Sequence, residues 1–440
     1  MQVSVETSQG LERKVHVSVP SNKIEEEVNS RLLTLSRKAK VAGFRPGKVP
    51  MNIIRKRFSN GVREEVARDL VQSSLYEALT DHNLTPAGAP SIEPKQLAAG
   101  EDFTYTAIFE IFPEINIKEI EQAEIEKVTA NVSDADVDTM ISKLQEQHKT
   151  WQKVERRPQS GDKVILDYKG FIDNEAFAGG ENQQQELVLG SDSFIPGFEE
   201  ALIDKPLHES FDIQVTFPSD YNQAELAGKQ ATFTITLHEV QAGETPELND
   251  DFAQKFNIKD GGITALKKDI KDNMVRELAR RVSAMNRDNV FDALMQANPF
   301  DLPKALVDKE IEHLNHEMYH RIFGTEHKDD EQIPELPREL FIKQAERRVH
   351  LGLLFAEYVK AHEIKPDEAR VNQTIETLAQ AYENPEELKQ WYQGNKERLA
   401  DVESLVMEEM VAEKAAESAN VVLVEKTYDD IMNSRNEDNA

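Results

Sequence analysis

The sequence predicts a multidomain α+β protein: an N-terminal α+β domain, a small half-barrel β domain with a short helix, and an elongated all-helical C-terminal domain. Three observations favour this fold class. The 440 residues, of which 39% are hydrophobic, are enough for several domains with real cores. Two regions alternate apolar and polar residues at the spacing of strands. After about residue 246 the apolar residues instead recur at the spacing of helices.

Residues 1–112 are expected to form the N-terminal domain, and about 110 residues is a typical domain size. Val15, Val17 and Val19 alternate with polar residues and predict a strand with one wet side, which ends at Pro20. The pattern then predicts helices over 24–39, 51–58 and about 62–79, and a last strand over 103–112.

The next two segments differ from each other in composition. Residues 113–150 are acidic with helical spacing and are expected to form a helical linker. Residues 151–243 carry β-branched runs between Gly and Pro, which predict the short strands of a half-barrel sheet. These runs are KVILDYKGFI, QELVLG, DIQVTFP and ATFTITLHEV.

Residues 244–432 are expected to be helical. Apolar residues keep a three-to-four spacing from Ile263 to Met285. Further helices are predicted over about 303–323, 338–362, 367–383 and 386–418, with Pro303, Pro337, Pro366 and Pro385 near their starts, where proline is tolerated. The polar tail NSRNEDNA, residues 433–440, is expected to be disordered.

Composition excludes several classes of function. The net charge of -29 repels nucleic acid on average, and the absence of cysteine excludes disulfides and a thiol nucleophile. The first ten residues show no basic stretch followed by an apolar run, and no window approaches about eighteen uninterrupted apolar residues. We therefore expect a cytoplasmic protein with no signal peptide and no membrane span.

One window inverts the overall charge. Residues 31–68 hold eleven Lys and Arg but only two acids, a local charge of +9. At its centre lies GFRPGKVP, residues 43–50, whose Gly and Pro predict a surface loop. Phe44 at the loop tip, flanked by Arg45 and Lys48, predicts a surface for RNA and protein. The alternative is a solvated connection between helices that needs Gly only for its backbone angles.

GFRPGKVP resembles the ribosome-docking signature of the bacterial trigger factor family, Gly-Phe-Arg-x-Gly-x-x-Pro. By this resemblance, the residues that contact the ribosome are Gly43, Phe44, Arg45, Pro46, Gly47 and Lys48. The family commonly carries Lys directly after the Arg, whereas this chain has Pro46. Proline stiffens the loop and removes one cation and one backbone donor.

Residues 151–243 resemble the FKBP-type peptidyl-prolyl isomerase domain through GDKVILDYKG, AFAGG, LVLGSDSFIPGFEEAL, VTFPSDY and ATFTITL. The residues that match the family's pocket are Asp167, Phe177, Ile195, Phe198, Tyr221 and Phe233. The alternative is that these aromatic residues only fill a core. Phe198, however, lies in a Pro-Gly-Phe turn, and such turns place side chains at a pocket rim.

The resemblance implies a reaction that needs no nucleophile. Amide resonance sets a barrier of about 18–20 kcal/mol to rotation of an X–Pro bond. A dry apolar pocket disfavours the charge-separated planar amide relative to the twisted one. The three phenylalanines would hold the proline ring, and the Tyr221 hydroxyl and the Ile195 N–H would donate to substrate carbonyls. Asp167 would orient the pocket or interact with the substrate amide.

A third motif points to a different class of enzyme. Residues 316–320 read HEMYH, the H-E-x-x-H pattern of zinc proteases on a predicted helix. The extended form of that motif fails, because Phe323 stands where Gly is required and Glu326 where a third His is required. We therefore predict no metal site, and keep the zinc protease as the alternative function.

The resemblance to trigger factor covers essentially the whole chain, and implies a ribosome-associated chaperone with prolyl isomerase activity. It implies docking on the large ribosomal subunit beside the exit tunnel, contact with nascent and unfolded polypeptides, and assistance to their folding and export. It also implies homodimers off the ribosome, and no ATP or other cofactor. The helical domain would bind unfolded chains through adaptable residues such as Met274, Met285, Met407 and Met410. A binding-only scaffold with an inert isomerase pocket is the second alternative.

Overall fold

The protein is described by a computed structural model covering residues 2–8, 10–39, 41–42, 44, 48–95, 101–121, 123–173, 175–221, 223, 225–258, 260–324, 336–379 and 384–433. The chain divides into two compact units. One contains residues 1–127 and 284–424, and the other contains residues 128–283 and 425–440. Each is described by itself below. The predicted multidomain α+β fold class is confirmed.

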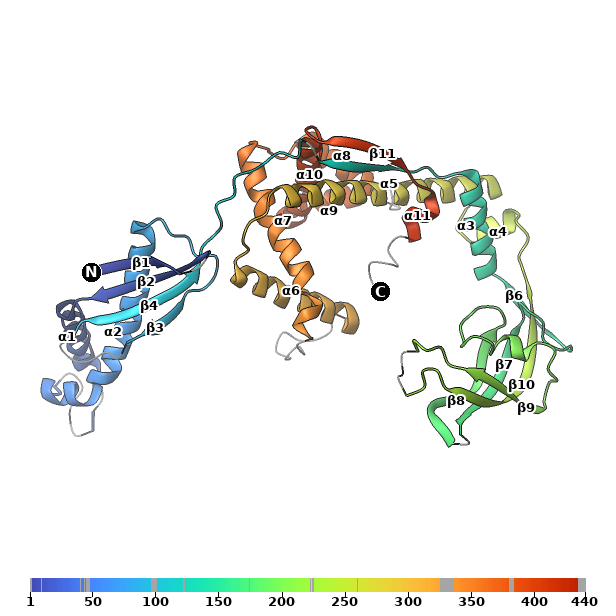
Figure 1. Cartoon of the computed structure of the whole chain (residues 1–440), viewed down its shortest axis with the longest axis horizontal. Coiled ribbons are helices and arrows are strands. Elements are labelled where there is room, and N and C mark those ends of the chain that lie inside the picture. The colour runs from blue at the N-terminus through green and yellow to red at the C-terminus, as the bar shows by residue number, and fades with distance from the viewer. Residues whose placement is uncertain are drawn as a thin grey trace. The chain divides into compact units, whose positions relative to one another are not determined.

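The N-terminal part is a four-stranded antiparallel sheet with two helices (Figure 1). Its elements are β1 (Gln2–Thr7), β2 (Glu12–Val19), α1 (Ser21–Lys38), α2 (Met51–Asp81), β3 (Ser91–Pro94) and β4 (Phe103–Glu110), with strand order β1-β2-β4-β3. Val15, Val17 and Val19 of β2 are buried together with Ile24, Val28 and Leu32 of α1, as the alternation in the sequence predicts.

Two expectations for this part are wrong. The two helices predicted over 51–58 and 62–79 are one helix, α2, which continues through Gly61. Gly within a helix costs only about 1 kcal/mol relative to Ala, and the buried residues Ile54, Val62 and Val66 hold both halves against one core. The expected single strand near the N-terminus is a hairpin, in which β1 pairs with β2.

The segment expected to be a helical linker is helical only in its second half. Residues 113–121 form neither helix nor strand, and β5 (Glu124–Thr129) follows as a strand that pairs with β11 (Asn420–Glu425). Ile115, Ile117 and Ile120 pack on the helical core, so their spacing serves a packed extended chain and not a helix. Helix α3 (Asp134–Gln147) begins where Ser133 and Asp136 form a capping box.

The second unit contains a five-stranded antiparallel sheet. Its strands are β6 (Thr150–Val154), β7 (Lys163–Ile172), β8 (Glu175–Val188), β9 (Ser210–Thr216) and β10 (Gln230–Glu244), in the order β6-β10-β7-β8 with β9 also paired to β10. The turn η1 (Glu200–Leu202) and the short helices α4 (Asp250–Gln254) and α11 (Tyr428–Asn433) also belong to this unit. Val164, Leu166, Ile235 and Leu237 are fully buried in its core, beside Phe198.

The helical region of the first unit contains α6 (Lys304–Phe323), η2 (Arg338–Leu340), α7 (Ile342–Ala361), α8 (Glu368–Ala379), α9 (Pro385–Gln393) and α10 (Lys396–Ala416), with part of the long helix α5 (Gly262–Ala297). The helix expected over 386–418 is therefore two helices. Gly394 ends α9, and the Asn395 side chain accepts hydrogen bonds from the N–H groups of Glu397 and Arg398 to start α10. Strand β11 is not among the elements predicted from the sequence, although Val421, Val422 and Val424 are β-branched.

In the part of the chain that the structure describes, the helices lack the combined length and apolar character that crossing a bilayer requires.

Candidate functional site

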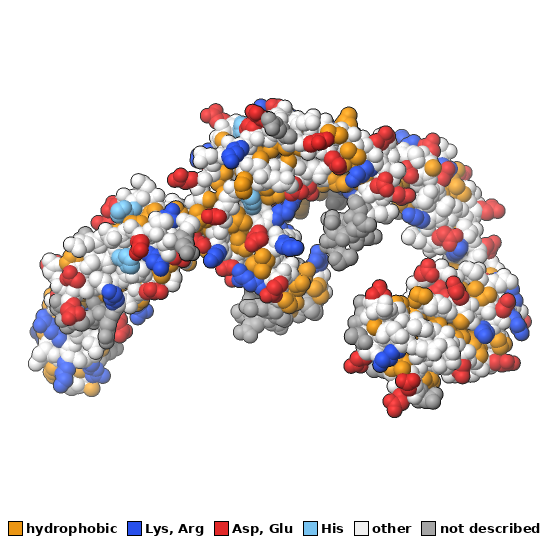
Figure 2. Space-filling model, viewed as in Figure 1, with side chains coloured by type: hydrophobic (Ala, Val, Ile, Leu, Met, Phe, Trp, Pro, Cys, Tyr) orange, Lys and Arg blue, Asp and Glu red, His pale blue; other side chains and the backbone are white. Residues whose placement is uncertain are grey.

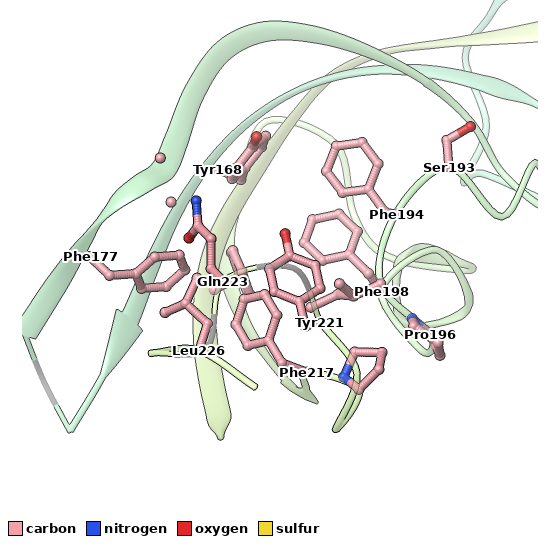
Figure 3. A pocket seen from close by; sticks show the side chains of 15 residues that line it. Tyr168, Phe177, Ser193, Phe194, Pro196, Phe198, Phe217, Tyr221, Gln223 and Leu226 are labelled. Carbon is pink, nitrogen blue, oxygen red and sulfur yellow. The ribbon is translucent and has the colours of Figure 1, made fainter. Parts of the chain in front are cut away.

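An aromatic pocket opens on the β sheet of the second unit (Figure 3). The cavity measures about 450 Å³. Its walls come from strands β7, β8 and β10 and from the loops that follow β8 and β9. The lining residues are Tyr168, Phe177, Gly179, Gly180, Ser193, Phe194, Ile195, Pro196, Phe198, Phe217, Pro218, Tyr221, Gln223, Leu226 and Phe233.

Phe198 is the centre of the ring network around this pocket. Its ring centroid lies 4.8 Å from that of Phe194, 5.3 Å from Phe233 and 6.0 Å from Tyr168. Phe198 is fully buried, and the Phe198–Phe233 and Phe198–Tyr168 pairs meet edge to face, as aromatic rings prefer. The floor of the pocket is therefore a rigid apolar surface.

Two glycines make room for the side wall formed by Phe177. A Cβ at Gly170 would lie 2.7 Å from both the Phe177 and Phe233 rings, and one at Gly180 would lie 2.7 Å from the Phe177 ring. Phe177 in turn meets the rings of Phe217 and Phe233 edge to face. These glycines are thus required by the close approach of an aromatic side chain to the backbone.

Two tyrosines supply the hydroxyl groups at the pocket. Tyr221 is 37% exposed at the rim, with its ring packed on Phe217 at 4.8 Å. Tyr168 is more enclosed, and burial, with a smaller contribution from Tyr221, raises the pKa of the Tyr168 hydroxyl. Tyr168 therefore stays protonated at neutral pH and can donate a hydrogen bond.

The structure brings together five of the residues that the sequence singles out: Phe177, Ile195, Phe198, Tyr221 and Phe233 all line the cavity. Asp167 does not line it. Successive residues of a strand point to opposite faces, and its neighbour Tyr168 faces the pocket. The Asp167 carboxylate accepts a hydrogen bond from the N–H of Gln184 (2.8 Å) and lies 2.8 Å from His238 Nε2. The Gln184 N–H and then His238 lower the pKa of Asp167.

Sequence reasoning missed several lining residues, notably Tyr168, Phe194 and Phe217. For Tyr168 a signal was available. Tyr168 follows Val164 and Leu166 at a spacing of two residues, so it lies on the same face of β7 as they do. Their apolar character marks that face as the inward one. Phe194 and Phe217 lie in loop and strand-end positions, where no periodicity indicates the direction of a side chain.

The second predicted site lies between α1 and α2. Phe44 is 38% exposed, and its N–H donates to the Val41 carbonyl. Lys48 is also exposed, whereas Gly43, Arg45, Pro46 and Gly47 lie outside the described residues. Figure 2 shows Lys and Arg side chains gathered at this end of the N-terminal part.

The local charge of +9 overstates how many cations at this end are free of ion pairs and could contact a polyanion. Arg31 forms ion pairs with Glu27, Glu65 and Asp69, and Arg63 pairs with Glu25. Three of these acids lie outside the window 31–68 over which the charge was counted. In the described part of the chain, Arg37, Lys38, Lys56 and Arg57 carry no ion pair, and they lie in the last turn of α1 and the second turn of α2.

The HEMYH motif lies on α6. Glu317 is 3.1 Å from His313 Nε2 and accepts hydrogen bonds from Arg348, while the rings of His316 and His320 lie 5.1 Å apart. Within the described ranges, His, Asp and Glu nowhere gather in a group of three or more that could hold a metal ion.

Comparisons with known proteins divide the chain in three. Residues 1–144 match the family described as bacterial trigger factor protein, residues 262–417 match the C-terminus of that family, and residues 154–238 match the FKBP-type peptidyl-prolyl cis-trans isomerase. The trigger factors of Stutzerimonas stutzeri and Ectopseudomonas mendocina are each 45% identical over 430 residues, covering 98% of both chains.

The trigger factor of Pseudoalteromonas atlantica is 40% identical over 435 residues, which is 99% of this chain and 100% of its own. A solved structure of the trigger factor chaperone, 17% identical, covers 95% of this chain and 99% of its own with a TM-score of 0.46.

Proposed function

This chain belongs to the bacterial trigger factor family, and on that premise we propose how its parts work. It is a ribosome-associated chaperone that binds nascent chains and carries an FKBP-type peptidyl-prolyl isomerase domain. We propose five parts: a ribosome-binding domain at 1–112, a linker at 113–150, the isomerase at 151–243, a helical chaperone domain at 244–432 and a tail at 433–440.

The aromatic pocket is the observation that carries the proposal for catalysis. Phe177, Phe198 and Phe233 would enclose the substrate proline in an apolar cavity. The X–Pro amide is most polar when planar, because resonance then separates its charge. A dry pocket built of rings therefore favours the twisted amide over either planar isomer and lowers the barrier to rotation.

Two hydrogen-bond donors at the pocket would orient the substrate. The Tyr221 hydroxyl stands at the exposed rim, and the backbone N–H of Ile195 lies beside Phe194. Either can donate to a carbonyl next to the proline and hold the peptide while its X–Pro bond turns. Asp167 would act indirectly, since its hydrogen bond to Gln184 ties β7 to β8 beside Tyr168.

For the N-terminal domain, we propose docking on the large ribosomal subunit near the tunnel exit through residues Gly43 to Lys48. Phe44 supplies an exposed apolar contact, and the cations at the adjoining ends of α1 and α2 supply attraction to RNA. Tethering raises the local concentration of nascent chains, so weak contacts without ATP suffice to shield them. We further propose that the protein is cytoplasmic, dimerises off the ribosome, and also assists export.

A proline-limited refolding assay tests the isomerase. Phe198→Ala should remove most of the catalysed rate while chaperone binding persists, because the change falls within the isomerase core. Thermal unfolding must be measured in parallel, since truncating a buried Phe costs about 3–5 kcal/mol. A wild-type chain that fails to accelerate the refolding would instead indicate the binding-only scaffold.

A further inference from the structure

One carboxylate beside the pocket is surrounded by backbone N–H groups. Glu199 is 7% exposed and follows Phe198, the floor of the pocket, in the sequence. Its Oε2 accepts from the N–H groups of Gly190 (2.7 Å), Ser191 (2.9 Å) and Asp192 (3.2 Å). Its Oε1 accepts from those of Ser193 (2.9 Å) and Phe194 (3.2 Å). Five consecutive N–H groups thus converge on a single side chain.

This arrangement requires the ionised form of Glu199. Burial on its own raises the pKa of a carboxyl group, but the N–H groups of Gly190, Phe194, Asp192 and Ser193 together bring the pKa of Glu199 below its ordinary value. Charge-assisted hydrogen bonds of this kind are about twice as strong as neutral ones. The loop they hold is unusual, since Gly190 and Asp192 both have positive φ, at 94° and 54°.

The clamped loop, residues 190–194, leads directly into the pocket wall. Ser193, Phe194 and Ile195 line the cavity, and the Phe194 ring packs on Phe198 and Tyr168. The Ile195 carbonyl accepts a hydrogen bond from the Phe198 N–H (3.0 Å), which closes the turn back to Glu199. The backbone of Ile195 is therefore fixed from both sides.

The Ile195 N–H is the first one beyond the clamp. In the described part of the chain no backbone or side-chain acceptor is paired with it, and the next residue, Pro196, has no N–H to offer. The loop thus satisfies five donors internally, and the sixth, which has no protein acceptor among the described residues, belongs to a residue that lines the cavity.

We propose that Glu199 is a positioning residue of the isomerase: its carboxylate sets the loop so that the Ile195 N–H and the Phe194 ring meet the substrate. This inference rests on the proposed function of the pocket, and adds to it the group that holds the donor in place. Glu199 itself does not line the cavity, so it would act on the peptide only through the loop.

Glu199→Gln in the full-length chain tests this role. The amide keeps the size of the side chain but replaces one acceptor oxygen with an NH₂ group, which must face N–H donors. The matched control is Glu200→Gln, which removes the same charge from the exposed neighbouring position. Isomerisation of a short peptide with a Leu-Pro bond should show kcat/KM reduced about 10-fold or more for Glu199→Gln and unchanged for Glu200→Gln.

The division between KM and kcat separates positioning from general damage. A donor to the substrate carbonyl acts in ground and transition states alike, so the loss should appear in KM with kcat within about 2-fold. A wild-type KM for Glu199→Gln would overturn the proposal while leaving the isomerase function intact. Wild-type protein with no activity on the peptide would instead overturn the function itself.

A measurement on wild-type protein covers the case in which Glu199→Gln does not fold. With ¹⁵N-labelled isoleucine, the Ile195 amide resonance should shift on addition of the Leu-Pro peptide, as expected for a new hydrogen bond. The resonance of Ile172, partly buried on β7, is the internal reference. An Ile195 resonance that does not move under saturating peptide would contradict the proposal.

Discussion

The side chain of Asn298 forms hydrogen bonds with both backbone polar groups of Lys118. Its Oδ1 accepts from the Lys118 N–H at 2.7 Å, and its Nδ2 donates to the Lys118 carbonyl at 2.9 Å. Asn298 is 4% exposed and follows the end of α5. A single amide therefore replaces the partner strand that the extended segment 113–121 lacks, and fixes that segment beside Ile117 and Ile120 on the helical core.

Asn298→Ala should lower the free energy of unfolding by about 1–3 kcal/mol, because it leaves the two partly buried backbone groups of Lys118 without partners. Urea denaturation of the full-length chain, followed by circular dichroism, measures this change. Asn372→Ala is the control, since Asn372 is exposed on α8 and bonds only within its own helix. Equal stability of the two variants would show that water replaces the lost amide.

Gly180→Ala should damage the isomerase by displacing the Phe177 ring, one of the walls proposed to hold the substrate proline. The added methyl would lie 2.7 Å from the Phe177 ring, so the ring must shift from its place in the cavity wall. We expect kcat/KM to fall about 10-fold and stability to fall by about 1–3 kcal/mol. Gly352→Ala, on α7, is the matched change at a glycine with open space, and should leave activity unchanged.

Phe44→Ala and Arg45→Ala should each reduce co-sedimentation with ribosomes. Phe112→Ala provides the comparison, because Phe112 is exposed to nearly the same degree, 41% against 38% for Phe44, but lies just beyond the end of β4. Ribosome binding by the wild-type protein should weaken as salt rises from low to physiological concentration. Salt screens the attraction between the cations near the loop and the phosphates of RNA. Identical binding by all four proteins would contradict docking through this loop.

Acid should release the clamped loop. The pKa of Glu199 lies below its ordinary value in the folded protein, so its ionised form stabilises the fold at and above the ordinary carboxyl pKa. That contribution is lost as the pH falls through the lower, folded pKa. The KM for the peptide should therefore stay constant near neutral pH and rise only in acid. The hydrogen-exchange rates of the backbone amides of residues 190–194 should increase over the same pH range. Glu199→Gln should lack this acid-dependent step, and a step that persists in the variant must be assigned to another group.

Alternation and helical spacing predict much of this fold from the sequence, as β2, β7 and α1 show. The failures occur where contacts distant in sequence decide. The spacing of Ile115, Ile117 and Ile120 suits a helix as well as an extended chain, and only the core beneath them and Asn298 select the extended form. Gly61 leaves α2 intact while Gly394 ends α9, because packing on both sides holds α2 together.

The candidate site shows the same limit at the scale of one residue. Resemblance pointed to Asp167, whereas Tyr168 lines the cavity, and a one-position shift along a strand moves a side chain to the opposite face. Glu199 could not be found from sequence at all. Next to Glu200 it resembles a solvated acidic pair, and only the fold brings five N–H groups around one of the two.

The ion pairs of Arg31 and Arg63 bear on how the N-terminal part approaches a polyanion. They neutralise cations along the bodies of α1 and α2, while Arg37 and Lys38 in the last turn of α1, with Lys56 and Arg57 near the start of α2, carry no ion pair within the described residues. These four unpaired cations thus lie at the ends that adjoin the loop, whereas acids and only one further unpaired cation of the window 31–68, Arg68, lie beyond the second turn of α2 within the described residues. Such a separation acts as an electric dipole, and under the proposed docking it would favour the approach of RNA to the end that carries Phe44.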